Sequence, residues 1–372
     1  MIIKLSGYPG SYRILSLAKD ETTRKKLFND NISTLTYNNA YGIILPENLR
    51  FPISKNEHEA LEQCCNYDVF EIDENGNAYR YYNNNSLDNA ILVTNRCNSN
   101  CLMCPTAEAV RRKKEDYDAD TLITLASHFP KDAPHITITG GEPFLIKKEL
   151  FRVLAFLKKN LPETSYLLLT NGRAFCSKKF AELFYETAPY DTILGIPLHG
   201  YNAETHDGIT QSKGSFDQTC LGLKYLLNLG SKVELRIVVS ALNVNFITKI
   251  AQLIVTEFPN VLCVKFIGLE MTGNAAKNKD SVWIEYPIAF TASKKAIDIL
   301  ISNRIDVGIY NFPLCAVDRK YWNICEKSIS DYKVRFAPMC DVCAVKDACG
   351  GIFSGTIRLA KENVVPVTGD YL

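Results

Sequence analysis

Short apolar runs alternate with stretches of helical periodicity through the middle of this 372-residue chain. A short apolar run is typical of a strand buried on both faces, and apolar positions recurring every three to four residues are typical of a helix packed on a sheet. The runs lie at 90–94, 135–139, 165–170, 192–198, 233–240 and 261–267, and the helical stretches at 118–128, 148–159, 177–187, 215–229, 245–257 and 287–303.

Six successive strand-helix units predict an α/β fold with a parallel sheet. Because crossovers between parallel strands are right-handed, such units form either a doubly wound sheet or a partial (β/α)6 barrel of the TIM type. Both architectures place their functional sites at the carboxyl ends of the strands. We therefore look for chemistry directly after each apolar run.

The two ends of the chain have other patterns. Residues 1–86 predict a small α+β unit with a helix near 58–64 and a hairpin formed by 67–72 and 78–82, since Asn-Gly between strand-like runs favours a tight turn. Residues 305–372 lose the alternation and are rich in cysteine. We expect three units, at 1–86, 87–304 and 305–372.

Composition narrows the class of partner. Lys and Arg total 42 against 41 Asp and Glu, so the net charge of +1 gives no general attraction to nucleic acid or to an anionic membrane. The sequence shows neither a signal-peptide pattern nor a long uninterrupted apolar run. We expect a soluble cytoplasmic protein whose 13 cysteines serve metal binding or catalysis rather than disulfides.

Three cysteines follow the first apolar run. Cys97, Cys101 and Cys104 have the spacing CxxxCxxC. A cubane [4Fe-4S] cluster normally takes four cysteine ligands, so three would leave one iron open to another ligand. Structural zinc is the alternative, although zinc prefers four ligands and the fourth is missing nearby. The spacing favours the cluster and leaves zinc open.

Further polar or glycine-rich segments follow later runs and fall on the same predicted edge. They are Gly140-Gly141-Glu142-Pro143 after the second run, Asn171 after the third, His199 after the fourth and Glu270 after the sixth. Arg236 lies inside the fifth run, where a buried charge needs a partner. The alternatives are an Asn-Gly turn for Asn171, a packed histidine for His199, a surface loop for Glu270 and a structural ion pair for Arg236.

The cysteine triad followed by Gly140-Gly141-Glu142-Pro143 resembles the radical S-adenosylmethionine (SAM) superfamily. The resemblance implies a partial barrel and a [4Fe-4S] cluster whose open iron is chelated by the methionine moiety of SAM. An external one-electron reductant would supply the electron that cleaves SAM to a 5'-deoxyadenosyl radical, which abstracts a substrate hydrogen.

The same resemblance implies which other residues serve the cofactor. Those expected to contact SAM are Gly140, Gly141, Glu142, Pro143, Met103, Asn171 and Arg236. Met103 stands where the family often has an aromatic residue near the adenine. His199 and Glu270 are the candidates for the substrate pocket.

A second cysteine set lies near the end of the chain. Cys340, Cys343 and Cys349 have the spacing CxxCxxxxxC, which resembles the SPASM or shorter twitch domains of radical SAM peptide maturases. With Cys315 as the upstream ligand, the resemblance implies one auxiliary [4Fe-4S] cluster. Cys325 is the alternative ligand, and zinc bound by four thiolates is the alternative metal.

The segments around these cysteines resemble the His-Xaa-Ser system radical SAM maturases of the HxsC type, notably at 313–315, 328–333, 338–346 and 349–354. Membership implies a ribosomally made precursor peptide with His-Xaa-Ser repeats as substrate, and a partner maturase. The N-terminal unit is then a candidate for binding peptide or partner. The alternatives are a radical SAM enzyme acting on RNA or a small metabolite, and a non-enzymatic iron-sulfur or zinc module that binds peptides.

Overall fold

A curved parallel sheet forms the centre of the computed structural model, which describes residues 1–113 and 116–369. Within those residues the sheet has eight strands in the order β15-β14-β13-β12-β11-β10-β9-β8, and all neighbours are parallel. The six predicted strands are confirmed as β8 Ala90–Leu92, β9 His135–Thr139, β10 Ser165–Leu169, β11 Thr192–Pro197, β12 Lys232–Val238 and β13 Cys263–Ile267.

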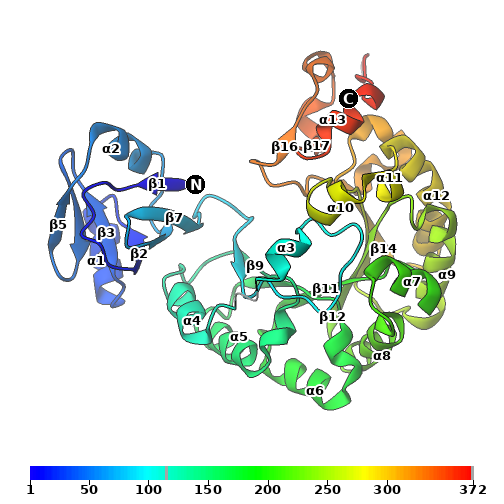
Figure 1. Ribbon diagram of the computed structural model, residues 1–372, viewed down its shortest axis with the longest axis horizontal. Helices are drawn as coiled ribbons and strands as arrows, with labels where there is room; N and C mark the ends of the chain where they lie inside the picture. The colour runs from blue at the N-terminus through cyan, green and yellow to red at the C-terminus, as the bar shows by residue number, and fades with distance from the viewer. Residues whose placement is uncertain (114–115, 370–372) are drawn as a thin grey trace.

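Helices cover the outer side of this sheet (Figure 1). The six predicted helices are present as α4 Ala119–Ser127, α5 Lys148–Asn160, α6 Lys178–Thr187, α8 Ser215–Asn228, α9 Ile247–Glu257 and α12 Tyr286–Ser302. Alternate strand residues such as Leu168, Leu235 and Phe266 are fully buried against them. The other alternate residues face the concave inner side, as the two-residue period of a strand requires.

Two strands of the sheet were not predicted. β14 Asp306–Tyr310 pairs with β13, and β15 Cys325–Glu326 pairs with β14. Both lie beyond residue 304, where the sequence alternation stops because no long helix follows either strand. The parallel sheet therefore continues into the segment that we expected to form a separate C-terminal unit.

The N-terminal residues form a sheet of their own in the order β1-β7-β6-β2-β3-β4-β5 (blue in Figure 1). The predicted hairpin is confirmed by the antiparallel pair of β6 and β7. The helix expected near 58–64 is α2, which begins after a capping box formed by Ser54 and Glu57. The elements are β1 Ile2–Lys4, β2 Arg13–Leu17, α1 Glu21–Asn29, β3 Thr34–Tyr37, β4 Tyr41–Leu45, β5 Leu49–Pro52, α2 Lys55–Glu62, β6 Val69–Ile72 and β7 Asn77–Tyr82.

One face of this N-terminal sheet packs on the end of α4. Ser16 Oγ lies 3.0 Å from His128 Nδ1, and the rings of Tyr82 and Phe129 have centroids 4.9 Å apart. The four residues are each at least nine-tenths buried. The contact joins the core of the N-terminal sheet face to the core of the barrel.

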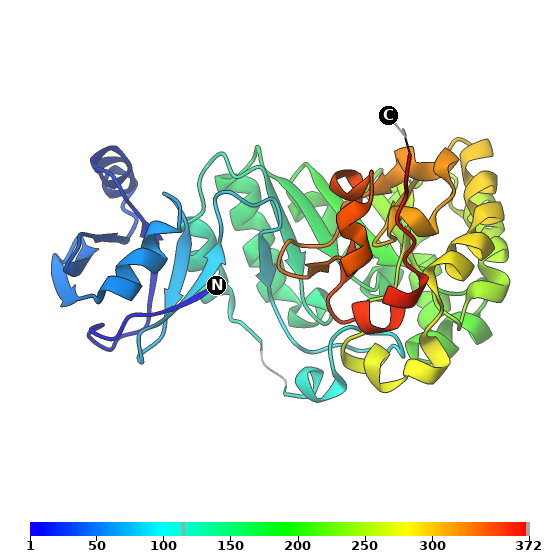
Figure 2. The same cartoon turned by 90° about the horizontal axis from the view of Figure 1, so that it is seen from above.

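The remaining C-terminal residues pack against the barrel on a different side from the N-terminal unit (Figure 2). They contain the two-stranded sheet of β16 Val334–Arg335 and β17 Ile352–Phe353, and the short helix α13 Ile357–Ala360. The other short helices are α3 Glu108–Arg111, α7 Ala203–Thr210, α10 Gly273–Lys277 and α11 Lys279–Val282. No helix in the described part of the chain has the length and apolar character needed to cross a membrane.

Candidate functional site

The Cys97–Cys104 loop lies at the carboxyl end of β8, on the sheet edge that the sequence predicts. Backbone hydrogen bonds fasten it to the end of α7: Asn100 N donates to Thr210 O and Leu102 N to Ile209 O, both at 3.0 Å. The loop therefore takes part of its shape from a helix more than 100 residues away in sequence.

Polar side chains from three other elements fix the loop more tightly. Arg111 of α3 donates to Ser99 O at 2.8 Å, and Asn274 of α10 donates to Cys101 O at 3.0 Å. Arg173, at the start of the 3₁₀ helix η2 Arg173–Cys176, donates to Asn98 O at 2.7 Å. These bonds satisfy loop carbonyls that would otherwise lack partners.

The Gly140–Pro143 segment runs directly beside the chain that leads into this loop. Gly141 N donates to Thr94 O at 2.8 Å and Glu142 N to Arg96 O at 2.7 Å. A Cβ on Gly141 would lie 2.2 Å from Arg96 O, and one on Gly140 would lie 2.5 Å from Thr94 O. The glycines therefore admit the close approach of the neighbouring backbone, and their predicted contact with SAM remains a prediction.

Glu142 is 2% exposed and joins two strand ends. Its carboxylate accepts from Phe144 N at 3.1 Å, Thr170 Oγ1 at 2.8 Å and Asn171 N at 2.7 Å. A carboxylate has about four acceptor positions, so about one remains, on Oε2. Burial raises the pKa of Glu142, while these bonds and the charge of Arg173 favour its ionised form.

Asn171 connects the cysteine loop with the Glu142 turn. Its amide Nδ2 donates to Asn98 Oδ1 at 2.6 Å, and its Oδ1 accepts from Arg173 N at 3.1 Å. Gly172 follows with a φ of +77°, so an Asn-Gly turn is also present. The turn that was the alternative interpretation of Asn171 is present, and its contact with SAM remains a prediction.

The thiols of the first site are partly shielded from solvent. Burial and the neighbouring thiols raise the pKa of Cys101 to about 12, and burial raises the pKa of Cys97. Thiols of this kind need a cation to become thiolates, and metal binding supplies one. Soft sulfur donors in this loop fit an iron-sulfur cluster or zinc.

The number of sulfurs bears on the choice between these two metals. A structural zinc site needs four ligands around one ion, and this loop offers three thiols. The ligands of a cubane bind different irons, so three thiols hold a cluster and leave one iron open. Both metals remain open at this loop.

The other predicted site residues have mixed surroundings. Met103 is 4% exposed in an apolar cluster with Ile209 and Met271. His199 is also buried; its ring lies 6.0 Å from the ring of His206, and its Nδ1 has no described partner. The roles predicted for Met103 at the adenine and for His199 at the substrate remain predictions.

Arg236 and Glu270 both have ionic partners. Arg236 Nη1 lies 3.5 Å from Glu234 Oε1 on the same strand. Glu270 lies 3.2 Å from Lys333 Nζ, and so ties the end of β13 to the C-terminal residues. The structural alternative of an ion pair is thus present at each position, and neither pair excludes contact with a ligand.

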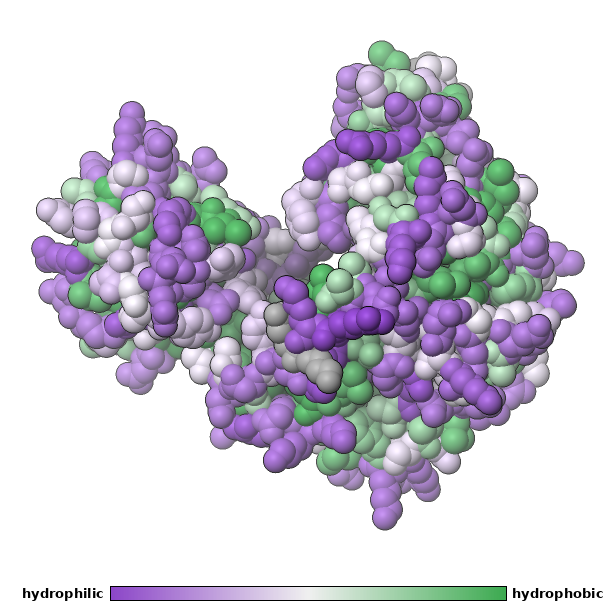
Figure 3. All heavy atoms as spheres, viewed as in Figure 1, coloured by the Kyte–Doolittle hydropathy of each residue, from purple (hydrophilic) through white to green (hydrophobic). Residues whose placement is uncertain are grey.

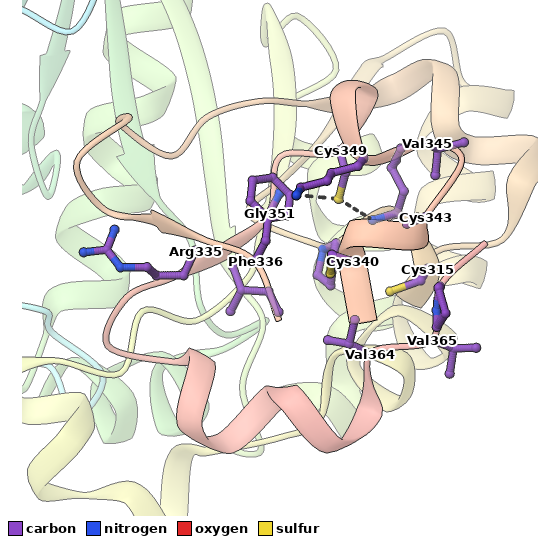
Figure 4. Close-up of a pocket in the computed structure, with 15 residues that line it drawn as sticks. Cys315, Arg335, Phe336, Cys340, Cys343, Val345, Cys349, Gly351, Val364 and Val365 are labelled. Atoms are coloured by element: carbon purple, nitrogen blue, oxygen red, sulfur yellow. Dashed lines mark hydrogen bonds between the residues drawn. The ribbon is translucent and has the colours of Figure 1, made fainter. Parts of the chain in front are cut away.

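The second cysteine set forms one pocket near the end of the chain (Figure 4). Cys315 lies in the 3₁₀ helix η4 Leu314–Ala316, and Cys340 in η6 Pro338–Val342. Cys343 and Cys349 complete the lining set of four, together with apolar residues such as Val364 and Ile352. Four soft donors around one pocket fit an iron-sulfur cluster with every iron ligated, and they also fit a zinc ion bound by four thiolates.

Backbone N–H groups point at two of these sulfurs. Cys349 Sγ accepts from Leu314 N and from Gly351 N, each at 3.4 Å, and Cys343 Sγ accepts from Val367 N at 3.4 Å. Cys325 instead donates to Tyr321 O at 3.5 Å and does not line the pocket. The geometry favours Cys315 over Cys325 as the fourth ligand.

Sequence reasoning missed the residues that position the first loop, namely Arg111, Arg173, Asn274 and Asn278. Asn274 and Asn278 lie about 170 positions from the loop, and nothing in their local pattern points to it. Arg173 directly follows a segment that was singled out, so its place after Asn171-Gly172 was the available signal.

Comparison with known proteins agrees with this geometry. Residues 91–245 match the family model described as the Radical SAM superfamily. The subtilosin biosynthesis protein AlbA of Bacillus subtilis, which is named for an antilisterial bacteriocin, is 31% identical over 163 residues, or 43% of this chain and 35% of AlbA. The AdoMet-dependent heme synthase of Methanosarcina barkeri is 26% identical over 166 residues, or 43% of this chain and 45% of the synthase. The chain thus spans about a third to a half of the length of these curated relatives.

Solved structures share the fold. SuiB of Streptococcus suis bound to the precursor peptide SuiA superposes with a TM-score of 0.51 at 13% identity, over 61% of this chain and 49% of SuiB. The same protein bound to S-adenosylmethionine gives 0.50 at 14% identity, over 61% of this chain and 51% of SuiB. The predicted α/β partial barrel is confirmed, and the doubly wound alternative is set aside.

Proposed function

We propose, on the premise that residues 91–245 are a radical SAM domain, that this protein cleaves SAM reductively and modifies a ribosomally made peptide. The observation that carries the proposal is the pairing of two segments at one sheet edge. The loop of Cys97, Cys101 and Cys104 offers three thiols, and the Gly140–Pro143 turn is hydrogen-bonded to the chain that enters it.

The chain's own residues have distinct tasks in this proposal. Cys97, Cys101 and Cys104 hold the cluster, and Glu142 and Asn171 keep the neighbouring strand ends at a fixed separation from it. The remaining acceptor position on Glu142 Oε2 suits the ammonium of SAM. The bound cluster and SAM together supply a carbon radical, and the protein orients and shields it.

A peptide substrate is supported by the relatives. AlbA is named for the biosynthesis of a bacteriocin, and SuiB has been solved with a precursor peptide. The finer proposal is a peptide with His-Xaa-Ser repeats and a partner maturase, and it rests on the sequence likeness at 313–315, 328–333, 338–346 and 349–354. The N-terminal sheet is the proposed binding surface for peptide or partner, beside the hollow that separates it from the C-terminal unit (Figure 3).

We also propose one auxiliary [4Fe-4S] cluster held by Cys315, Cys340, Cys343 and Cys349. The common pocket and the N–H donors at Cys349 and Cys343 support it. Four thiolates would leave no iron open, so this cluster would transfer electrons or stabilise the fold rather than bind substrate directly.

A small metabolite is the second candidate substrate. The heme synthase of Methanosarcina barkeri and the GTP 3',8-cyclase of Paenarthrobacter nicotinovorans, 27% identical over 146 residues, support it. RNA is less favoured, because the net charge of +1 offers no general attraction to phosphate. A non-enzymatic module predicts no SAM cleavage at all.

Anaerobic reconstitution tests these proposals in two steps. Protein loaded with iron and sulfide is incubated with SAM and dithionite, and 5'-deoxyadenosine is measured by chromatography; we expect its formation to depend on all three cysteines of the first loop. Mass spectrometry of a candidate His-Xaa-Ser precursor peptide then shows whether hydrogen is lost or a bond is formed. No 5'-deoxyadenosine would refute the enzyme proposal, and SAM cleavage with an unchanged peptide would refute the peptide assignment.

A further inference from the structure

An arginine is buried beside the first cysteine loop. Arg111, the last residue of α3, is 8% exposed. Its guanidinium donates to Ser99 O at 2.8 Å and to Asn100 Oδ1 at 2.6 Å. Both acceptors lie between Cys97 and Cys101 in the sequence. The positive charge is therefore held against the segment that joins two of the three predicted cluster ligands.

This charge has no carboxylate partner. Within residues 1–113 and 116–369 no ion pair includes Arg111, although the adjacent Arg112 pairs with Glu108 at 2.5 Å. The Nε of Arg111 has no hydrogen-bond partner among the described residues either. A buried charge without an opposite charge is unfavourable, because burial removes the water that would stabilise it. The neutral oxygens of the loop reduce this penalty and leave the charge uncompensated.

Arg173, which also contacts this loop, differs in this respect. Its guanidinium donates to Asn98 O at 2.7 Å. The charge of Arg173 favours the ionised form of the buried Glu142, so these two groups partly balance each other. Of the two arginines that donate to backbone oxygens of the loop, Arg111 is the one whose charge is not balanced by a carboxylate.

The charge of Arg111 acts on the thiols of the loop. Burial raises the pKa of Cys97 and, together with the neighbouring thiols, that of Cys101; the charge of Arg111 opposes the rise at both. A positive charge has this effect because it stabilises a thiolate more than a thiol. Arg111 is therefore close enough to influence the sulfur atoms that are predicted to hold the cluster.

We propose that Arg111 is the counter-ion of the first-site cluster and raises its reduction potential. A cluster held by thiolates is negatively charged and becomes more so on reduction, so a nearby positive charge stabilises the reduced form more than the oxidised form. The step concerned is the transfer of one electron from an external reductant to the cluster, and no bond forms or breaks in it. The inference rests on the proposed function for the cluster itself.

Burial makes the charge of Arg111 effective. Charges in the interior interact more strongly than charges at the surface, where water and salt screen them. The side chain of Arg112 is 78% exposed and already paired with Glu108, so its charge should have little influence on the cluster. These two adjacent arginines therefore offer a matched comparison, in which the same charge is removed from a buried and from an exposed position.

Redox titration of the reconstituted protein, followed by electron paramagnetic resonance, measures the effect. The signal that changes when SAM is added identifies the first-site cluster, and its midpoint potential is measured without SAM. In Arg111→Gln we expect the reduction equilibrium to shift by about tenfold toward the oxidised form, which is about 59 mV to more negative potential for one electron. Arg112→Gln should shift this equilibrium by less than about twofold, because the exposed charge is screened.

Arg111→Lys separates charge from hydrogen bonding. Lysine keeps the positive charge but lacks the planar fork that donates to both Ser99 and Asn100. We expect its reduction equilibrium to stay within about threefold of that of the wild type. Equal shifts in Arg111→Lys and Arg111→Gln would show that the hydrogen bonds set the potential, and would refute the counter-ion role.

Iron and sulfide analysis checks that each variant is loaded. If Arg111→Gln does not load, Arg111→Met replaces it, because methionine removes the charge without burying another strongly polar group. Loading of Arg111→Lys but of neither neutral variant would support the counter-ion role. Failure of all three variants to load would show that Arg111 only shapes the loop, and would refute that role.

Two further results separate this inference from the proposed function. An unchanged potential in loaded Arg111→Gln refutes the inference alone, and weaker SAM binding at that unchanged potential would assign Arg111 to SAM instead. The potential is measured without SAM cleavage. The expected shift in a protein that yields no 5'-deoxyadenosine would therefore refute the proposed function and leave the counter-ion role standing.

Discussion

The two cysteine sites differ in ligand number and in what holds their loops. The first offers three thiols on a loop fastened by α3, α7, α10 and η2. The second offers four thiols on short turns of its own, with backbone N–H groups at the sulfurs. The first site therefore depends on the whole barrel for its shape, and the second depends mainly on the C-terminal turns.

This difference in support corresponds to a difference in what each site must hold. A site with one ligand missing needs exact placement of a second component, and distant elements provide the placement here. A site with four thiol ligands surrounds its metal by itself and needs no second component placed beside it. Changes in the barrel should therefore damage the first site and spare the second.

Loss of a cysteine in the first loop should have the largest effect. In Cys101→Ala, SAM cleavage should fall to background, because the cluster loses a ligand. Iron content should fall from about eight to about four per chain, since the C-terminal site still loads. Iron analysis and 5'-deoxyadenosine chromatography measure both. Cys176→Ala, outside both sets, is the control, and retention of all iron in Cys101→Ala would contradict the assignment.

The glycine turn should be almost as sensitive. Gly141→Ala places a Cβ 2.2 Å from Arg96 O, so the turn and the cysteine loop must separate. We expect SAM binding, measured by equilibrium dialysis, to weaken by at least about tenfold, or about 1.4 kcal/mol. Gly208→Ala is the matched control, because nothing lies within 4 Å of its Cβ and alanine favours the helix α7. Similar SAM affinity in the two variants would show that the close approach is unimportant.

Cys315→Ala tests the closed site. It should lose the auxiliary cluster and about half of the iron while keeping SAM cleavage, because Cys315 lines a pocket that includes none of the three cysteines of the first loop. Cys325→Ala should keep both clusters, since its thiol donates to Tyr321 O and does not line the pocket of the other four cysteines. Electron paramagnetic resonance of the reduced proteins distinguishes one cluster from two. The reverse pattern would make Cys325 the ligand.

A residue that positions the first loop should affect the stability of the fold rather than the chemistry itself. Asn274→Ala removes side-chain hydrogen bonds with Asn100, Cys101 and Glu108. At about 1 kcal/mol each, the free energy of unfolding should fall by about 3 kcal/mol. Denaturant titration measures it, with Asn303→Ala as the control, because that exposed side chain donates only to its own helix. Iron analysis of Asn274→Ala gives a second readout. Loss of iron from the C-terminal site, with the first site still loaded, would contradict the comparison of the two sites.

The smallest effect should come from mild acid. Burial lowers the pKa of His199 to about 3 and that of His206 to about 4, with Asp207 opposing the shift at His206. The unfolded chain takes up protons below about pH 6.5 while the folded chain does not, so the stability these residues contribute falls as the pH falls. Between pH 7 and 6 the loss should be about 1 to 2 kcal/mol for the pair. In His199→Phe the dependence should be shallower, and an unchanged slope would exclude this cause.

Much of the fold could be predicted because apolar periodicity reports burial directly. All six predicted strands of the barrel are present, since each is buried against helices on its outer face. β14 was missed because no long helix follows Asp306–Tyr310, so the strand-helix alternation that marks the other strands stops there. The seven-stranded order of the N-terminal sheet depends on pairings between distant segments, which local pattern does not report.

The cysteine ligands and the glycine turn of the first site could be predicted from the sequence, but the residues that hold the loop in place could not. Cys97, Cys101, Cys104 and the Gly140–Pro143 turn carry a recognisable spacing. Asn274 and Arg173 act through the fold, because only tertiary structure brings them to the loop. The approach of Gly141 to Arg96 O was likewise invisible, since the close neighbour is backbone and leaves no sequence signal.

The packing of the N-terminal sheet on the end of α4 has a consequence for any peptide bound to that sheet. A buried contact of Ser16, His128, Tyr82 and Phe129 holds the N-terminal sheet against the barrel, so the sheet is packed on the barrel and not attached by a linker alone. A peptide bound to this sheet would span a constant distance to the opening of the barrel. On the proposed function, the distance between the docked segment and the barrel would then decide which residue of the peptide is modified.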